Sequence, residues 1–202
     1  MGWKDTAIYR RLRHGKALRG WMEGGFGSPV PAVVKRAVLR RHHIPGAVWI
    51  ETGTFQGDTT AVLARFALRV VSLEPAPELY KKAEARFRGS PSVQIINAPS
   101  EVAFPRLLNN LTGPVCFWLD GHYSGGTTFQ GETDTPIGDE MDAIEAALPH
   151  LGQIAVLIDD IRLFDPENPV HAGYPSLDAV VDWARRCGLN WKIEHDIFIA
   201  TR

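Results

Sequence analysis

Short apolar runs alternate with helical patterns along most of the chain. Each run is short, bounded by Gly, Pro or polar residues, and predicts a strand. The predicted strands are Val48–Thr52, Arg69–Glu74, Val93–Asn97, Val115–Asp120 and Ile154–Ile158. The predicted helices between them are Asp58–Phe66, Pro77–Arg86, Ser100–Leu108 and Asp139–Leu148. Repeated strand–helix units of this kind imply a parallel sheet with helices on both faces.

The two ends of the chain depart from this alternation. Two helices, at about residues 5–22 and 31–41, are predicted before the first strand. After a helix capped by Ser176, the stretch "LNWKIEHDIFIATR" predicts two strands with almost no loop, which makes them antiparallel neighbours. The predicted fold class is α/β: a Rossmann-like doubly wound sheet, mostly parallel, with a C-terminal antiparallel hairpin and N-terminal helices. Residues 1–45 are predicted as a helical arm or lid belonging to the same domain as the main unit, residues 46–202.

The composition indicates how large a core the chain can bury and in which cellular compartment we expect it. The 202 residues are 45% hydrophobic and 22% charged, which is enough for one well-buried core. No apolar run approaches the length that spans a bilayer, so no membrane association is predicted. Cys116 and Cys187 lack the spacing of metal ligands. We interpret both as reduced packing residues of a cytoplasmic protein.

The net charge of −1 conceals a strongly basic N-terminal arm. Residues 1–41 hold ten Lys or Arg and only two acids. Such an arm could meet nucleic acid or an anionic surface. The alternative, which we favour, is a solvated helix with Ile8, Leu12, Leu18 and Trp21 along its buried side. Exposed apolar residues on the arm would also suit a homodimer.

Acidic residues gather where the predicted strands end. The five ends read "ETGTFQGDTT", "LEPAP", "NAPSE", "WLDGH" and "IDDIR", each with an acid or with a polar residue close to one. Ligands of open α/β sheets bind outside the carboxyl ends of the strands. One strand-end acid is usually a solvated cap, but five at the same edge predict a lined crevice.

The first strand end indicates the kind of ligand. Gly53 and Gly57 allow a tight turn and a close approach of ligand to the next helix, but their spacing does not fit the dinucleotide fingerprint. Glu51 would repel a pyrophosphate and suits a cationic amino group. Glu74 lies 21 residues after Gly53, close to the interval at which an acid binds ribose hydroxyls. The crevice therefore suits a positively charged nucleoside rather than NAD.

These residues carry a family resemblance over roughly residues 46–202. "WIETGTFQGDTTAVLA" resembles the first motif of class I S-adenosylmethionine-dependent methyltransferases, in the variant of the catechol and caffeoyl-coenzyme A O-methyltransferases. "VVSLEPAPELYKKA" resembles their second motif, "IINAPSEV" the third, and "FWLDGH" and "VLIDDI" the fourth and fifth. The tandem "LDGHY" and "IDD" are also similar to the macrocin O-methyltransferase group, which acts on sugar hydroxyls.

The resemblance implies S-adenosylmethionine as cofactor and assigns residues to the first part of it. Glu51, Gly53 and Gly57 would line the methionine moiety. Thr54 and Phe55 lie in the same loop and are included among the predicted cofactor-binding residues. The loop lacks the middle glycine of the wider superfamily, as the O-methyltransferase variant does.

The same resemblance assigns the remainder of the cofactor. Glu74 would bind the ribose hydroxyls, and Pro99, Ser100 or Glu101 would edge the adenine. The segment before Ser100 departs from the Gly-Ala-Ser that is usual in those enzymes. Asp120 is also included, since it could bind the cofactor's amino group.

A metal site is implied at the ends of the fourth and fifth strands. Those O-methyltransferases bind a divalent ion at positions that match Asp120, Asp159 and Asp160. Hard oxygen ligands suit Mg²⁺, which would orient an acceptor hydroxyl and lower its pKa. The alternative is that Asp160 caps a loop and that Asp120 binds the cofactor or a backbone amide.

The predicted catalytic residues are Asp120 and His122. An imidazole titrates near neutral pH and could take the hydroxyl proton during attack, although His122 could instead close its loop by hydrogen bonding. The long segment 118–136, "WLDGHYSGGTTFQGETDTP", is predicted to form a lid over the acceptor, and residues 164–175 a second wall. Glu140 could anchor the lid or contact polar hydroxyls.

The predicted function is O-methylation of a small polar acceptor, a sugar or phenol, with help from a divalent metal. One alternative is a catalytically idle nucleoside-binding module, against which the costly cluster of acids argues. Another is an RNA methyltransferase that uses the basic arm. The run "RRLRHGK" contains no aromatic residue, which argues against a base-stacking platform and against nucleic acid as partner.

Overall fold

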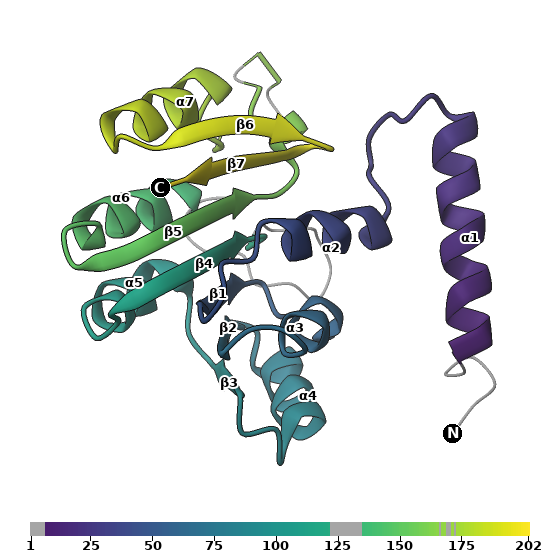
Figure 1. Ribbon diagram of the computed structural model, residues 1–202, viewed down its shortest axis with the longest axis horizontal. Helices are drawn as coiled ribbons and strands as arrows, with labels where there is room; N and C mark the ends of the chain where they lie inside the picture. The colour runs from purple at the N-terminus through teal and green to yellow at the C-terminus, as the bar shows by residue number, and fades with distance from the viewer. Residues whose placement is uncertain (1–6, 122–134, 166, 169–170, 172) are drawn as a thin grey trace.

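The computed structural model describes residues 7–121, 135–165, 167–168, 171 and 173–202. Within them, one seven-stranded sheet has the order β3-β2-β1-β4-β5-β7-β6 (Figure 1). The strands are β1 (Val48–Thr52), β2 (Arg69–Leu73), β3 (Val93–Ile96), β4 (Gly113–Leu119), β5 (Leu151–Ile158), β6 (Asn190–Glu194) and β7 (Ile197–Thr201). The first five strands pair in parallel, while β7 is antiparallel to both β5 and β6. The predicted fold class is confirmed.

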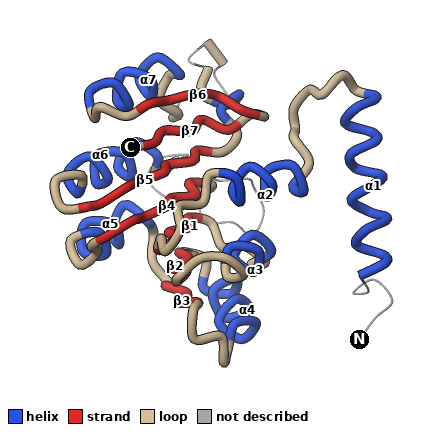
Figure 2. The backbone as a smooth tube through the Cα atoms, in the orientation of Figure 1, coloured by secondary structure: helices blue, strands red, loops and turns tan. Residues whose placement is uncertain are grey.

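Helices cover both faces of this sheet (Figure 2). The helices of the described residues are α1 (Ala7–Glu23), α2 (Ala32–Arg41), α3 (Asp58–Leu63), α4 (Pro77–Phe87), α5 (Ser100–Leu108), α6 (Ile137–Ala147) and α7 (Leu177–Arg186), with a short 3-10 helix η2 (Ile161–Leu163). Phe104 of α5, Ile144 of α6 and Val180 of α7 belong to the core on one face. Val38 of α2 and Leu63 of α3 belong to the core on the other.

Alternating side chains of the central strands supply both cores. In β1, Trp49 joins the core under α2 and α3, whereas Ile50 joins the core under α5 to α7. In β4, Phe117 lies on the second of these faces, between Cys116 and Trp118 on the first. Such strands are buried on both sides, which explains why they read as continuous apolar runs rather than as alternating patterns.

The C-terminal hairpin closes on two residues in the left-handed region. His195 has φ 50° and Asp196 has φ 65°, and Glu194 pairs with Ile197 across the turn. Two successive positive φ values are the mark of the hairpin turn whose twist matches that of its strands. The near absence of a loop was therefore sufficient to predict the antiparallel pair.

Several element boundaries and one buried position differ from the prediction. β4 begins at Gly113, β5 at Leu151 and α6 at Ile137, all earlier than expected. Gly113 pairs with Leu151, so the ladder extends through residues that carry little apolar signal. The expectation that Leu12 lies on a buried side of the first helix is wrong, because 64% of this residue is exposed.

Leu12 is exposed because α1 stands beside the rest of the molecule rather than on it (Figure 1). Trp21 near its end contacts the His195 ring, with centroids 5.4 Å apart. No helix in the described part of the chain is both long and apolar enough to cross a membrane. Cys116 and Cys187 are free thiols, and burial raises the pKa of Cys116 to about 12.

Candidate functional site

The loop after β1 needs its two glycines to fit against the fold. Gly53 has φ 80°, and a Cβ there would lie 2.7 Å from the carbonyl oxygen of Asp120. Gly57 has φ 74°, and a Cβ there would lie 2.6 Å from the Phe87 ring. The space beside each glycine is thus filled by protein. The expected tight turn is present, but these glycines bring the loop against β4 and α4 instead of clearing space for a ligand.

Glu51 ends β1 in a buried network of hydroxyl groups. Its Oε2 accepts a hydrogen bond from Ser72 Oγ at 2.6 Å and another from Thr60 Oγ1. Thr54 Oγ1 lies 2.6 Å from Ser72 Oγ, which draws the loop into the same network. Burial raises the pKa of Glu51 to about 7, and the bonds from Ser72 and Thr60 only partly oppose it. A nearby positive charge would therefore stabilise this carboxylate.

Glu74 follows β2 and is held by backbone amides on both oxygens. Oε2 accepts from the Phe55 amide at 2.7 Å, and Oε1 accepts from the Ala76 amide at 3.0 Å. Asn97 donates to the Glu74 carbonyl at 2.7 Å and so fixes the strand end. A carboxylate has about four acceptor sites, so two remain for a diol. Burial raises the pKa of Glu74, while the two amide bonds oppose that shift.

The predicted adenine edge lies at the start of α5, beside an acid of α6. Pro99 is the extended residue before α5, and Ser100 is its buried first residue. Glu140 is buried as well, and its Oε1 has no hydrogen-bond partner within the described residues. Burial raises the pKa of Glu140 to about 7, although bonds with Ser100 and Thr52 lower it. In the sequence analysis, Glu140 received only a contact or anchoring role. Acidic residues lie close to it on both sides in the sequence, so they do not indicate that its side chain is buried.

Asp120, Asp159 and Asp160 come together at the ends of β4 and β5. One carboxylate oxygen from each lies within 4.8 Å of the others. Burial, followed by the charge of Asp159, raises the pKa of Asp120 well above its usual range. Burial also raises the pKa of Asp159 to about 6. Three hard oxygen donors with mutual repulsion form a set that fits Mg²⁺.

A lysine of the N-terminal arm already bonds to this acidic cluster (Asp120, Asp159 and Asp160). Lys35 Nζ, on α2, lies 2.6 Å from Asp159 Oδ2 and 2.6 Å from Asp160 Oδ1. Burial would lower the pKa of Lys35, but the charge and hydrogen bond of Asp159 outweigh it and raise that pKa. Arg162 Nη1 adds a bond to Asp160 Oδ1 at 2.7 Å. The ammonium therefore binds the same two carboxylates that a metal ion would use.

Sequence reasoning missed Lys35 and left other site residues untested. Lys35 lies 124 residues before Asp159, and nothing in the local pattern distinguishes it from the other bases of the arm. His122 and most of the predicted lid fall outside the described residues. In the second predicted wall, residues 164–175, Phe164 is buried. Its ring packs against the Tyr174 ring, with the two centroids 5.3 Å apart.

Comparison with known proteins yields one curated relative by sequence. Over 84 residues the chain is 37% identical to protein-L-isoaspartate O-methyltransferase 1 of Anaeromyxobacter sp. (strain Fw109-5). The match covers 41% of this chain and 40% of that protein, so the chain spans less than half the length of the relative. No family model matches the chain.

Solved structures resemble the chain over most of its length. The 23S rRNA methyltransferase ErmE has a TM-score of 0.50 and 18% identity, covering 86% of this chain and 68% of that one. SMU.1697c, a putative methyltransferase from Streptococcus mutans in complex with SAH, has a TM-score of 0.51 and 14% identity, covering 87% and 98%. At such identities the likeness concerns the fold alone. The chain has the Rossmann-like class I fold of S-adenosylmethionine-dependent methyltransferases.

Proposed function

We propose that this protein is an S-adenosylmethionine-dependent methyltransferase that methylates an oxygen of a small polar acceptor, such as a sugar or a phenol. The observation that carries the proposal is the pair of buried carboxylates, Glu51 and Glu74, at neighbouring strand ends in the methyltransferase fold. Glu74 keeps two acceptor sites for a ribose diol. Glu51 is a buried acid that a cationic cofactor would stabilise.

Within this proposal each strand end contributes one part of the site. Thr54 and Phe55 hold the loop between the two carboxylates, through bonds to Ser72 and Glu74. Methyl transfer needs the acceptor oxygen, the methyl carbon and the departing sulfur in line, so rigid positioning supplies much of the rate. Asp120 and His122 remain the predicted catalytic residues at the next strand end, where the acceptor would lie.

Asp120, Asp159 and Asp160 support a divalent ion as a further component. Their oxygens are close enough to share one cation, and two of them carry raised pKa values that a cation would relieve. Bound there, Mg²⁺ would lower the pKa of the acceptor hydroxyl and orient it. Of the two resembled groups, the macrocin group supports a sugar hydroxyl as the accepting atom and the catechol group a phenol.

The name of the curated relative supports oxygen as the accepting atom. That protein is an O-methyltransferase, and the shared segment covers 41% of this chain. Its L-isoaspartate acceptor is not carried over, because only 40% of the relative takes part in the match.

The test is a calorimetric titration with S-adenosylhomocysteine, with and without Mg²⁺. We expect saturable binding, and we expect Glu74→Gln to weaken it about tenfold or more, since a hydrogen bond to a charged group contributes about 1.5–3 kcal/mol. Glu84→Gln is the matched control, because Glu84 lies on the exposed face of α4 and bonds to Tyr80. Thermal unfolding of each variant shows whether the fold is kept.

Each outcome of this titration bears on a separate claim. Failure of the wild-type protein to bind in either buffer would overturn the methyltransferase proposal. Equal affinity of Glu74→Gln and wild type would remove Glu74 from the ribose site. Binding without methyl transfer to any polyhydroxylated or phenolic acceptor would favour the idle nucleoside-binding module.

A further inference from the structure

A groove of about 820 Å³ is lined by residues of α1, α2, α3 and α4 and of the turn after α3. Among the described residues, its lining contains six arginines and a single acid, Asp58, with no Phe, Tyr or Trp. The arginines are Arg13, Arg36, Arg40, Arg41, Arg65 and Arg86. We call this region the arginine groove.

Most of the positive charge in the arginine groove has no counter-ion. Arg86 Nη1 forms an ion pair with Asp58 Oδ1 at 2.8 Å, and Arg41 forms an ion pair with Glu194, which lies outside the groove. Arg13, Arg40 and Arg65 form no ion pair with any residue that the structure describes. A solvated arginine needs no partner, but several around one hollow repel each other and favour an anion between them.

Arg36 provides independent evidence of a missing acceptor. Its Nε is buried and bonds to nothing in the described part of the chain. Its Nη2 lies 3.9 Å from Asp58 Oδ2, and that carboxylate is already bonded to Arg86. Burial lowers the pKa of Arg36, the charge of Asp58 opposes this shift, and the charges of Arg13 and Arg86 add to it. An unbonded buried donor destabilises the folded protein, and a bound acceptor would remove that cost.

We propose that the arginine groove binds a phosphate group of a phosphorylated small molecule, and that this molecule is the methyl acceptor. Arginine forks match phosphate oxygens two at a time, which a single point charge cannot do. The volume lies in the range of small-molecule sites. Proteins that bind single-stranded nucleic acid stack its bases on aromatic rings, and the described residues of the lining include no Phe, Tyr or Trp.

The position of the groove connects it with the candidate site. Arg36 follows Lys35, whose ammonium lies on Asp159 and Asp160. Asp58 follows Gly57, at the end of the loop predicted to line the cofactor. As part of the proposal, a phosphate held at Arg36 belongs to a ligand whose remainder extends toward the reacting edge. The identity of this ligand as the acceptor rests on the proposed function, whereas the phosphate site itself does not.

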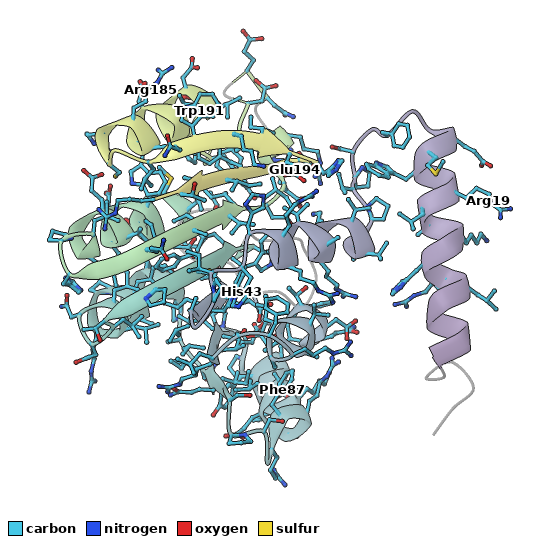
Figure 3. All side chains as sticks on the ribbon, in the orientation of Figure 1. Arg19, His43, Phe87, Arg185, Trp191 and Glu194 are labelled. Atoms are coloured by element: carbon cyan, nitrogen blue, oxygen red, sulfur yellow. The ribbon has the colours of Figure 1, made fainter. Side chains whose placement is uncertain are left out.

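The experiment is a calorimetric titration of the full chain with inorganic pyrophosphate, with acetate at equal ionic strength as blank. The test variant is Arg13→Gln combined with Arg40→Gln, which removes two groove charges without altering a described ion pair. The control is Arg19→Gln, on the same helix as Arg13, with a side chain that points away from the body (Figure 3). Each protein is also titrated with S-adenosylhomocysteine.

We expect pyrophosphate to bind wild type and Arg19→Gln with affinities within about twofold, and to bind the double variant at least about tenfold more weakly. Cofactor affinity should be equal in all three proteins. No saturable pyrophosphate binding, or equal loss in Arg19→Gln, would overturn the phosphate site. Tighter, steeply salt-dependent binding of a single-stranded RNA would replace the small molecule by nucleic acid. Pyrophosphate binding without any cofactor binding would keep the phosphate site and overturn both the methyltransferase and its acceptor.

Discussion

Two neighbouring residues of α2 lie in opposite electrostatic surroundings. Lys35 places its ammonium 2.6 Å from oxygens of both Asp159 and Asp160. The buried Nε of Arg36 forms no hydrogen bond with any described residue. Its Nη2 lies 3.9 Å from Oδ2 of Asp58. The acidic cluster thus contains its own counter-cation, whereas the arginine groove lacks a sufficient counter-anion.

This difference indicates how each region would respond to a ligand. A cation that enters the acidic cluster must compete with Lys35, so binding it costs the contacts that tie α2 to β5. An anion that enters the arginine groove beside Arg13, Arg40 and Arg65 breaks no ion pair between described residues, and it relieves existing repulsion. The first region therefore favours exchange between two cations, and the second favours simple binding.

The largest effect is expected from Lys35→Met, studied in EDTA and then with Mg²⁺. Removing the ammonium leaves a buried carboxylate pair with Arg162 as its remaining described cation, which we expect to cost about 3 kcal/mol of unfolding free energy in EDTA. Added Mg²⁺ should bind this variant about tenfold more tightly than wild type and recover part of the loss. Urea unfolding and calorimetry measure the two quantities.

Two controls make this result specific. Lys81→Met removes an exposed lysine paired with Glu78 and should leave the free energy of unfolding nearly unchanged, since exposed ion pairs contribute little. Asp159→Asn combined with Asp160→Asn should abolish Mg²⁺ binding and leave S-adenosylhomocysteine affinity intact. Unchanged metal affinity in Lys35→Met would show that Lys35 and the ion do not compete. The expectation that a cation entering the acidic cluster must displace Lys35 would then be wrong.

Glu140→Gln tests the stability contribution of another buried acid. Unlike Asp159 and Asp160, Glu140 has no cation beside it among the described residues. Its pKa is raised from 4.5 to about 7, so the folded state binds the proton more tightly than the unfolded state does. The stability from this group is therefore complete below pH 4.5 and is lost as pH rises to about 7. At about 1.4 kcal/mol per pH unit the loss amounts to about 3 kcal/mol.

The measurement is the free energy of unfolding of both proteins at about pH 5 and pH 8. An amide does not ionise, so the variant should gain on wild type by about 3 kcal/mol between these values. Glu51 also has a raised pKa, but it is present in both proteins and cancels from the difference. If the free energies of unfolding of the two proteins change equally with pH, the charge of the Glu140 carboxylate is compensated in the folded protein.

The fold was predictable from local pattern, since β1 to β5 are separated by helical segments and the central strands are buried on both faces. Errors arose where tertiary structure overrides that pattern. Gly113 joins β4 through its pairing with Leu151, and Leu12 is exposed because α1 does not pack as an amphipathic helix should. Neither fact is encoded within a few residues of the position concerned.

The candidate site was predictable only where strand ends converge. Parallel strands bring Asp120 and Asp159 to one edge in any sheet of this order, so their proximity follows from topology. The contacts of Lys35 depend instead on how α2 crosses the sheet. The arginine groove likewise depends on how four helices pack, and its charges are distributed along the chain from Arg13 to Arg86.

The smallest effect is expected from Arg36→Gln. Its charge is buried, is repelled by Arg13 and Arg86, and has only a distant share of Asp58. Removing it should leave the unfolding free energy within about 1 kcal/mol of wild type, or slightly above it at low salt, whereas the adjacent Lys35→Met is strongly destabilising. Repeating both measurements in about 0.5 M NaCl should reduce any gain of Arg36→Gln without removing it, because salt screens the exposed Arg13 and Arg86 but screens the partly buried Arg36 much less. If Arg36→Gln costs as much as Lys35→Met, the guanidinium is already compensated in the folded protein, and the arginine groove has no need of an anion.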